Sequence, residues 1–410
     1  MIELLKEIKS AFAELSPFEA LGLIVTYLVA IHTGVVSALI PTYIIIVPFI
    51  IYLFLVARKL WQEKKSSRSS WALACFSCLL VLSTFVNGGD AVGAVASVLL
   101  YAVIVMVFEY YGSEKIMTPI KVFCLIGSLL LIADTISIFL FPEGLGEPGP
   151  EGFSYFLGYK SYRVWIAIPT ILFASIWSLD SYHRIQLPVY LLAVLAVASS
   201  VMSGATMGSV TLVLDIVGLL IISKMGNRPK SADFRILVPV TFALALVITL
   251  PGLITQALSP ALELVGKTST LSGRTIIWDK TWGLILTSPL LGFGYVQPET
   301  YAEIMGFAGA TTPHNLPLAV LGYSGLLGII AVIVAGVFAF RDYRPGRDAI
   351  SDCIALIILM NTFMGITSCN LFAAFVLPML SILELRQQAI LDDKNQVTAE
   401  GTKEWEDIEH

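Results

Sequence analysis

The sequence contains too few charged residues for a water-soluble protein of its length. Asp, Glu, Lys and Arg make up 13% of the 410 residues, against roughly 25% in an average soluble domain. Apolar residues make up 57%, and the mean hydropathy is +0.83. Because an aqueous globule cannot hide that much apolar surface, the composition excludes a soluble fold and predicts an integral membrane protein.

The sequence also lacks a disulfide framework. Its five cysteines fall within or at the ends of apolar runs, where a thiol behaves as a small apolar group: Cys75, Cys78, Cys124, Cys353 and Cys369. Cys75 and Cys78 form a CxxC pattern, but a redox or zinc role needs exposed thiolates and further ligands that this run does not supply. We therefore expect the cysteines to be packing residues.

No stretch between the apolar runs is long enough for a sizeable soluble domain. Runs of about 20 residues, which cross roughly 30 Å of hydrocarbon, follow one another from Phe18 to Leu385. We expect an all-α, polytopic membrane protein with about twelve transmembrane helices, over a membrane domain of residues 18–386. Residues 1–17 are expected to form an amphipathic cytoplasmic segment, and residues 387–410 a polar cytoplasmic tail. The expected spans are residues 18–37, 39–57, 71–87, 91–109, 119–141, 164–180, 187–203, 206–223, 236–255, 315–340, 350–367 and 370–386.

Positive charges are unequally divided between the two sides of this topology. Of the 25 Lys and Arg residues, 20 fall on the side of the two termini and five on the other side. Since Lys and Arg near span ends favour the cytoplasmic side, both termini are expected in the cytoplasm of a bacterial-type inner membrane. The five extracytoplasmic cations are Lys160, Arg163, Lys267, Arg274 and Lys280.

Two extracytoplasmic loops, residues 142–163 and residues 256–314, are much longer than the others. The second lies between the expected spans 9 and 10, and loops of this length are typically functional or disordered. Part of it has an apolar face at helical spacing, with Pro289 and two glycines after it; the face consists of Ile277, Trp278, Trp282, Ile285 and Leu286. We expect an interfacial or re-entrant helix over about residues 273–287, because tryptophan favours the headgroup level.

Three polar residues of these loops are candidates for chemistry: Arg163, Arg274 and His314. A guanidinium presents paired donors that match phosphate oxygens and stays charged, so two of them can hold a diphosphate headgroup. A histidine can take up a proton near neutrality. Taken alone, each arginine is more often a lipid-headgroup contact, and His314 more often a structural hydrogen-bonding residue.

The order of short motifs around Arg274 and His314 resembles that of the O-antigen ligase and polymerase superfamily. A Gly-Arg-Thr with a following tryptophan, a Pro-Leu-Leu-Gly-x-Gly turn, a His-Asn pair and a Gly-Leu-x-Gly occur in one outer loop and the next span. Here they are Gly273, Arg274, Thr275 and Trp278, then residues 289–294, then His314 and Asn315, then Gly325, Leu326 and Gly328. The resemblance covers about sixty residues, and the rest of the chain agrees with the family in topology.

The resemblance implies a metal-independent glycosyltransferase without a cofactor. Such an enzyme takes a glycan from an undecaprenyl diphosphate carrier and joins it to an acceptor hydroxyl. Arg274 and Arg163 would bind the diphosphate, and His314 would serve the acceptor as the catalytic residue. Asn315 is a candidate supporting residue beside it.

The sequence departs from the family at one position. The family often carries a further arginine in a Ser-x-Ser-Arg stretch, where residues 203–206 here read Ser, Gly, Ala and Thr. Either two arginines suffice, or Lys160 or Lys267 replaces the third. Glu299 and Glu303 are spaced for one helical face and are candidates for a second base or a sugar contact, although loop carboxylates are usually solvated.

Ionisable groups within the expected spans are further candidates, because a charge near mid-membrane costs about 2.5 to 3.5 kcal/mol on insertion scales. They are His32, Asp134 and Asp215. We expect the two aspartates to be protonated or paired inside the bundle; the alternative is that they line a substrate path. Asn361 and Asn370 are expected to bond neighbouring helices.

We expect a polysaccharide polymerase that joins lipid-linked repeat units at the outer face of the cytoplasmic membrane, because the Gly-Arg-Thr form resembles exopolysaccharide polymerases. The first alternative is an O-antigen ligase, which transfers the glycan to a lipid A core or another acceptor. From another class, a polysaccharide transporter or flippase would place its charges along a central path. Expected partners are the glycan donor and acceptor, membrane lipids, and chain-length regulator and flippase proteins. Nucleic acid is not expected, since no basic face exists in water.

Overall fold

A computed structural model describes most of the chain. The described residues are 12–13, 15–31, 42–63, 66–145, 153–224, 233–253, 273–306, 310–368, 371 and 375–406. Most of the expected amphipathic segment, as well as His32, Lys267 and Asn370, lies outside them.

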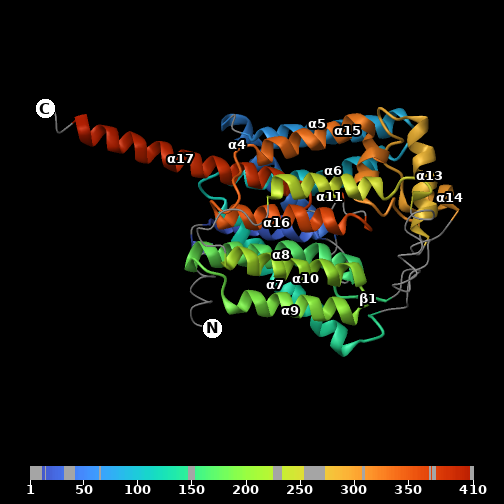
Figure 1. Ribbon diagram of the computed structural model, residues 1–410, viewed down its shortest axis with the longest axis horizontal. Coiled ribbons are helices and arrows are strands. Elements are labelled where there is room, and N and C mark those ends of the chain that lie inside the picture. The colour runs from blue at the N-terminus through green and yellow to red at the C-terminus, as the bar shows by residue number, and fades with distance from the viewer. Residues whose placement is uncertain are drawn as a thin grey trace.

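The described part of the chain is almost entirely helical (Figure 1). Twelve helices overlap the twelve expected spans, one for each span, within the described residues. They are α2 (Pro17–Ala30), α4 (Thr42–Glu63), α5 (Arg68–Val86), α6 (Ala91–Tyr111), α7 (Met117–Leu140), α8 (Lys160–Tyr182), α9 (Leu187–Met202), α10 (Thr206–Lys224), α11 (Phe234–Val247), α15 (Leu316–Phe340), α16 (Ala349–Met364) and α17 (Pro378–Glu406). The expected long outer loop contains α13 (Arg274–Thr287) and α14 (Pro298–Met305), and β1 (Ser154–Tyr155) pairs with β2 (Gly158–Tyr159) in an antiparallel hairpin.

The bundle has the surface of a membrane protein. Within the described residues, six helices (α5, α6, α7, α8, α10 and α15) are long and apolar enough to cross a bilayer. Large apolar side chains point outward, among them Val92, Phe85 and Leu187, which are 81%, 75% and 67% exposed. Such a surface suits lipid and not water. The number of twelve crossings stays a prediction.

Several boundaries differ from the expected spans. Helix α2 ends at Ala30 and α11 at Val247, and both are shorter than the hydropathy pattern predicts. Helix α17 begins only at Pro378, and it continues through the expected polar tail as far as Glu406. Hydropathy reports how apolar a stretch is and not where its helix ends, which explains these differences.

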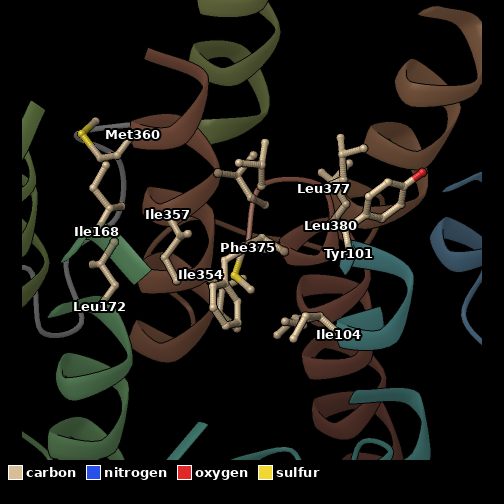
Figure 2. Packing of buried hydrophobic residues seen from close by; sticks show 14 of the residues in the cluster. Tyr101, Ile104, Ile168, Leu172, Ile354, Ile357, Met360, Phe375, Leu377 and Leu380 are labelled. Atoms are coloured by element: carbon tan, nitrogen blue, oxygen red, sulfur yellow. The ribbon is translucent and has the colours of Figure 1, made fainter. Parts of the chain in front are cut away.

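Figure 2 shows the part of the core where α6, α8 and α16 meet the segment before α17 and the first turn of that helix. Ile168 and Leu172 lie one turn apart on α8, and Ile354 and Ile357 lie one turn apart on α16, so each pair presents one face of its helix. The amide of Asn361 donates to the carbonyl oxygen of Phe375 at 3.1 Å; a bond to a neighbouring helix was expected, and this one reaches the segment before α17. Packing and bonds of this kind hold helices together where lipid offers no hydrophobic drive.

Helices α13 and α14 and the β1–β2 hairpin lie at the same end of the bundle, called the loop end below (Figure 1). At the opposite end, α16 begins with Asp348 as its N-cap, and Arg386 Nε lies 2.9 Å from Asp348 Oδ2. Burial raises the pKa of Asp348, but the hydrogen bonds and charge of Arg386 and the bonds from Ser351 outweigh it and hold that pKa below its ordinary value. The carboxylate is therefore charged at neutral pH and fixes the start of α16 against α17.

Helix α15 was expected as one continuous span but is broken at Gly325, which has φ 64° and ψ −164°. The turn of residues 289–294 fills the break. The amides of Leu326 and Leu327 donate to the carbonyl oxygens of Pro289 and Leu290, at 2.9 and 3.2 Å. The amide of Phe293 in turn donates to Gly322 at 2.7 Å. Two motifs that lie about thirty residues apart in the sequence are thus one backbone-bonded unit, and these bonds satisfy backbone groups that the break would leave without a partner.

The same turn is bonded to α5, which lies beside α15 (Figure 1). Asn87 Nδ2 donates to the carbonyl oxygen of Gly292 at 3.0 Å, and the amide of Tyr295 donates to Thr84 Oγ1 at 2.8 Å. A Cβ added to Gly294 would lie against the backbone of Thr84. Glycine is required here because the turn passes between two helices without space for a side chain.

We predict that Gly325→Ala destabilises the protein, because its backbone conformation costs about 1 to 3 kcal/mol for a residue with a side chain. The added Cβ would also collide with the carbonyl of Leu290. Thermal unfolding in detergent measures the effect. The control is Gly336→Ala in the same helix, where a Cβ meets nothing within 4 Å and helix propensity predicts a gain of up to about 1 kcal/mol. Equal midpoints for the two variants would contradict the role of the break.

Candidate functional site

Helix α13 crosses the loop end and begins at Arg274 (Figure 1). Gly273 precedes it with φ 85°, a left-handed conformation that turns the chain into the helix. The half-buried Arg274 side chain donates from Nε to the carbonyl oxygen of Thr367, at 3.1 Å. Thr367 belongs to the turn of residues 365–367 that follows α16, so this contact joins α13 to the end of α16. The helix expected at residues 273–287 is confirmed, whereas its place at the headgroup level stays a prediction.

His314 is held just before α15 in a conformation that few residues adopt. Its φ is 49°, and its amide donates to Thr312 Oγ1 at 3.3 Å. A left-handed residue other than glycine is uncommon, although histidine is among the types enriched there, and such strain concentrates at functional positions. The side chain is half-buried, so it is not enclosed in the core.

Asn315, the N-cap of α15, is fully buried and bonds its own helix and two other segments. Its Nδ2 donates to the carbonyl oxygens of Ala245 at 2.7 Å and Ile366 at 3.0 Å, while its Oδ1 accepts from the amide of Leu318 at 2.9 Å. The amide of Leu316 donates to Gly365 at 2.7 Å. Asn315 therefore fixes the start of α15 against α11 and the turn of residues 365–367.

Two tryptophans complete the connection. Trp278 Nε1 donates to the carbonyl oxygen of Pro313 at 3.0 Å, and Trp282 Nε1 donates to that of Thr249 at 2.9 Å. Trp278 is 1% exposed, so it acts as a buried link and not as the membrane anchor that the sequence suggested. Helix α13 thus begins with Arg274 and also holds Pro313, the residue before His314. The acceptors of these bonds are backbone carbonyls, so the pattern of side chains in the sequence does not predict them.

Arg163 lies in the first turn of α8 and is 1% exposed. Its Nε lies 2.9 Å from Asp134 Oδ2, and its Nη1 donates to the carbonyl oxygen of Ser199 at 3.3 Å. The guanidinium also stacks over the ring of Tyr155, at 5.0 Å from the centroid. The pairing expected for Asp134 is therefore observed, and its partner is one of the two candidate arginines.

The place where the family often carries its further arginine lies beside Arg163. Residues 203–205 form the turn from α9 to α10, which begins at Thr206, and Ser199 precedes this turn on α9. The Ser200 hydroxyl donates to the carbonyl oxygen of Ala205 at 3.4 Å, and a Cβ added to Gly208 would lie against Val164. The α9–α10 turn and the start of α8 thus form one locality at the loop end.

The remaining candidate residues are either exposed to solvent or have side chains outside the described part of the structure. Glu299 and Glu303 are exposed on α14, which packs on α13 through Tyr301, whose hydroxyl lies 2.6 Å from Thr281 Oγ1. Lys160 begins α8, but its side chain is not among those described, and Lys267 is outside the described residues. Among the described residues, no three His, Cys, Asp or Glu side chains are grouped so that they could hold a metal ion.

Asp215 is fully buried in α10, and neither carboxylate oxygen has a hydrogen-bond partner among the described residues. The expected pairing is therefore not found for this aspartate there. A charged carboxylate without a partner is costly at a buried position, so we expect the Asp215 carboxyl group to be protonated.

Comparison with known proteins identifies the domain that carries these elements. Residues 161–333 match the family model described as O-antigen ligase, and this range includes Arg163, Arg274, His314 and the break in α15. Neither the comparison with curated proteins nor the comparison with solved structures gave a match. The match over residues 161–333 supports placing the chain in the O-antigen ligase and polymerase superfamily of glycosyltransferase-like enzymes, and the apolar helices support a membrane protein.

Proposed function

We propose that the protein polymerises undecaprenyl-diphosphate-linked oligosaccharide repeat units at the outer face of the cytoplasmic membrane. The observation that carries the proposal is the joining of Arg274 and the His314–Asn315 pair to one turn, residues 365–367, inside the matched family domain. An anion-binding group and a proton acceptor held by one rigid scaffold suit transfer from a diphosphate carrier.

In this proposal, Arg274 binds the diphosphate of the donor. It lies at the start of α13, where the helix dipole also favours an anion. His314 accepts the proton of the acceptor hydroxyl as its oxygen attacks the anomeric carbon of the donor. The bond from that carbon to the diphosphate breaks with its electron pair, and undecaprenyl diphosphate leaves. No metal or cofactor takes part, and Glu299, Glu303, Lys160 and Lys267 remain candidates for contacts with sugar or phosphate.

The second candidate is a ligase, which uses the same donor chemistry and differs in its acceptor. The surface polysaccharide of a deletion strain distinguishes the two functions. Single repeat units left on the carrier lipid are expected for a polymerase, whereas full-length chains left on the carrier would indicate a ligase. A transporter is disfavoured because Asp134 forms an ion pair with Arg163, while Asp215 is buried without a partner among the described residues. These two aspartates therefore do not line a path of charges.

The proposed orientation places the loop end outside the cell and both termini in the cytoplasm, as the positive charges predict. This would bring the site to the face where flippase and chain-length regulator proteins deliver and handle the lipid-linked glycan. Reporter fusions measure the orientation directly. A fusion after residue 65 that is extracytoplasmic, or one after residue 280 that is cytoplasmic, would contradict it.

We predict that Arg274→Lys weakens donor binding. A lysine keeps the charge but loses the paired donors of the guanidinium, and losing a charged hydrogen bond of about 2 to 3 kcal/mol corresponds to roughly 30- to 150-fold in affinity. Binding of purified protein to undecaprenyl diphosphate measures it. Arg341→Lys, at an exposed position of the opposite end, is the control. Unchanged affinity in Arg274→Lys would remove Arg274 from the proposed site.

We predict that His314→Gln lowers the turnover rate by roughly 10²- to 10⁴-fold, because this is what a positioned general base contributes. Donor binding is expected to be unchanged. Glutamine retains a hydrogen-bonding group but cannot accept the proton. The assay uses purified protein with lipid-linked donor and acceptor. His183→Gln is a matched control, because His183 is also a left-handed histidine (φ 54°) and ends α8 at the opposite end. Near wild-type turnover in His314→Gln would show that the residue orients a ligand and does not act as the base.

A further inference from the structure

Arg163 cannot reach a ligand in the conformation described here. It and Asp134 are each 1% exposed, and the β1–β2 hairpin, residues 154–159, covers the guanidinium with the ring of Tyr155. Of the donors of this enclosed group, Nη2 has no hydrogen-bond partner among the described residues, and Nε meets Asp134 only as an ion pair. A permanent structural ion pair is expected to satisfy all its donors, because an unpaired buried donor is costly.

The hairpin is held down by the same residue that neutralises Arg163. Asp134 accepts the amide of Leu157 at 2.8 Å through Oδ1, while its Oδ2 faces Arg163 Nε at 2.9 Å. One turn further along α7, Ser137 Oγ accepts the amide of Phe156 at 3.1 Å. Tyr155 is tied to the preceding segment by its hydroxyl, which donates to the carbonyl oxygen of Pro142 at 2.9 Å.

These contacts couple the hairpin to the charge of Arg163. The two strands contain two residues each, and a hairpin of that size is not stable without its anchors. An anionic oxygen that binds Arg163 competes with Asp134 for the same guanidinium. When Asp134 is displaced, the acceptor that holds Leu157 is displaced with it, so occupation of Arg163 and release of the hairpin are one event.

We propose that the β1–β2 hairpin is a lid over Arg163, latched by Asp134 and Ser137, and that it opens when a phosphate oxygen of the lipid diphosphate replaces Asp134 on Arg163. The identity of the ligand rests on the proposed function; the latch itself rests on the contacts of Asp134, Ser137 and Tyr155. In this arrangement Asp134 is a positioning residue, and Arg163 becomes a ligand-binding residue only in the open state.

Hydrogen exchange of the full-length protein in lipid nanodiscs tests the lid, with undecaprenyl diphosphate as the probe. We expect the amides of Phe156 and Leu157 to exchange at least about tenfold faster with the probe, which corresponds to about 1.4 kcal/mol of opening free energy. Helix α13, which starts at Arg274, is expected to become protected in the same experiment. A parallel arm with inorganic diphosphate distinguishes the sources: opening by both probes means that the anion suffices, and opening by the lipid alone means that the chain is also needed.

The failures of the two proposals are distinguishable. Protection of α13 without faster exchange in residues 154–159 would overturn the lid and leave the donor site standing. No change at either place would overturn both proposals.

Ser137→Ala provides a second test, because it removes one latch without touching Arg163. We expect faster exchange of Phe156 without the probe, and a smaller further increase on adding it. The matched control is Thr135→Val on the same helix, since among the described residues the Thr135 hydroxyl bonds within α7, to Leu131 at 2.8 Å. Exchange in Ser137→Ala equal to that of the control would mean that Ser137 does not hold the hairpin, and would overturn the latch.

Discussion

The structure depends on one set of backbone hydrogen bonds, those between the turn of residues 289–294 and the two halves of α15 on either side of its break. A membrane helix that stops and restarts leaves amides and carbonyls that lipid cannot satisfy. Here the amides after Gly325 bond to the turn, and the turn bonds back to Gly322 and to the end of α5. The position of α13 follows from these bonds, because the turn is its direct continuation. So does the position of His314, because it precedes the first half of the broken helix.

The candidate site also depends on the turn formed by Gly365, Ile366 and Thr367, whose side chains are not distinctive. Their carbonyl oxygens accept from Leu316, Asn315 and Arg274, respectively. Arg274 and the two residues that follow His314 are thereby held by one turn that belongs to a third segment. Such a site tolerates little movement of α16, whose other end is fixed by the Asp348–Arg386 pair. The loop end is thus positioned by contacts across the whole bundle.

Much of the helix inventory could be predicted from the sequence, because hydrophobic runs and their polar breaks reflect a physical constraint of the bilayer. The helix beginning at Arg274 was also predictable, since the apolar face of α13 has helical spacing and a proline and glycines follow it. Partners were not predictable. That Asp134 meets Arg163 depends on how α7 lies against α8, and that Trp278 meets Pro313 depends on the fold of a whole loop. The break at Gly325 was hidden because a glycine in an apolar run has the same hydropathy whether the helix continues or stops.

The contact between the turn and α5 also sets an order on the making of the protein. Ser83, Thr84 and Asn87 belong to the third expected span, but the residues that bond them, Gly292 and Tyr295, are synthesised about two hundred residues later. Until those residues are synthesised, the Thr84 hydroxyl and the Asn87 amide have only their bonds within α5, to the carbonyl oxygens of Leu80 and Ser83. A chain that ends before residue 289 therefore lacks every contact that joins α5 to this turn. The third expected span is thus made early, but its end acquires its contacts to the turn only after more than two thirds of the chain has been synthesised.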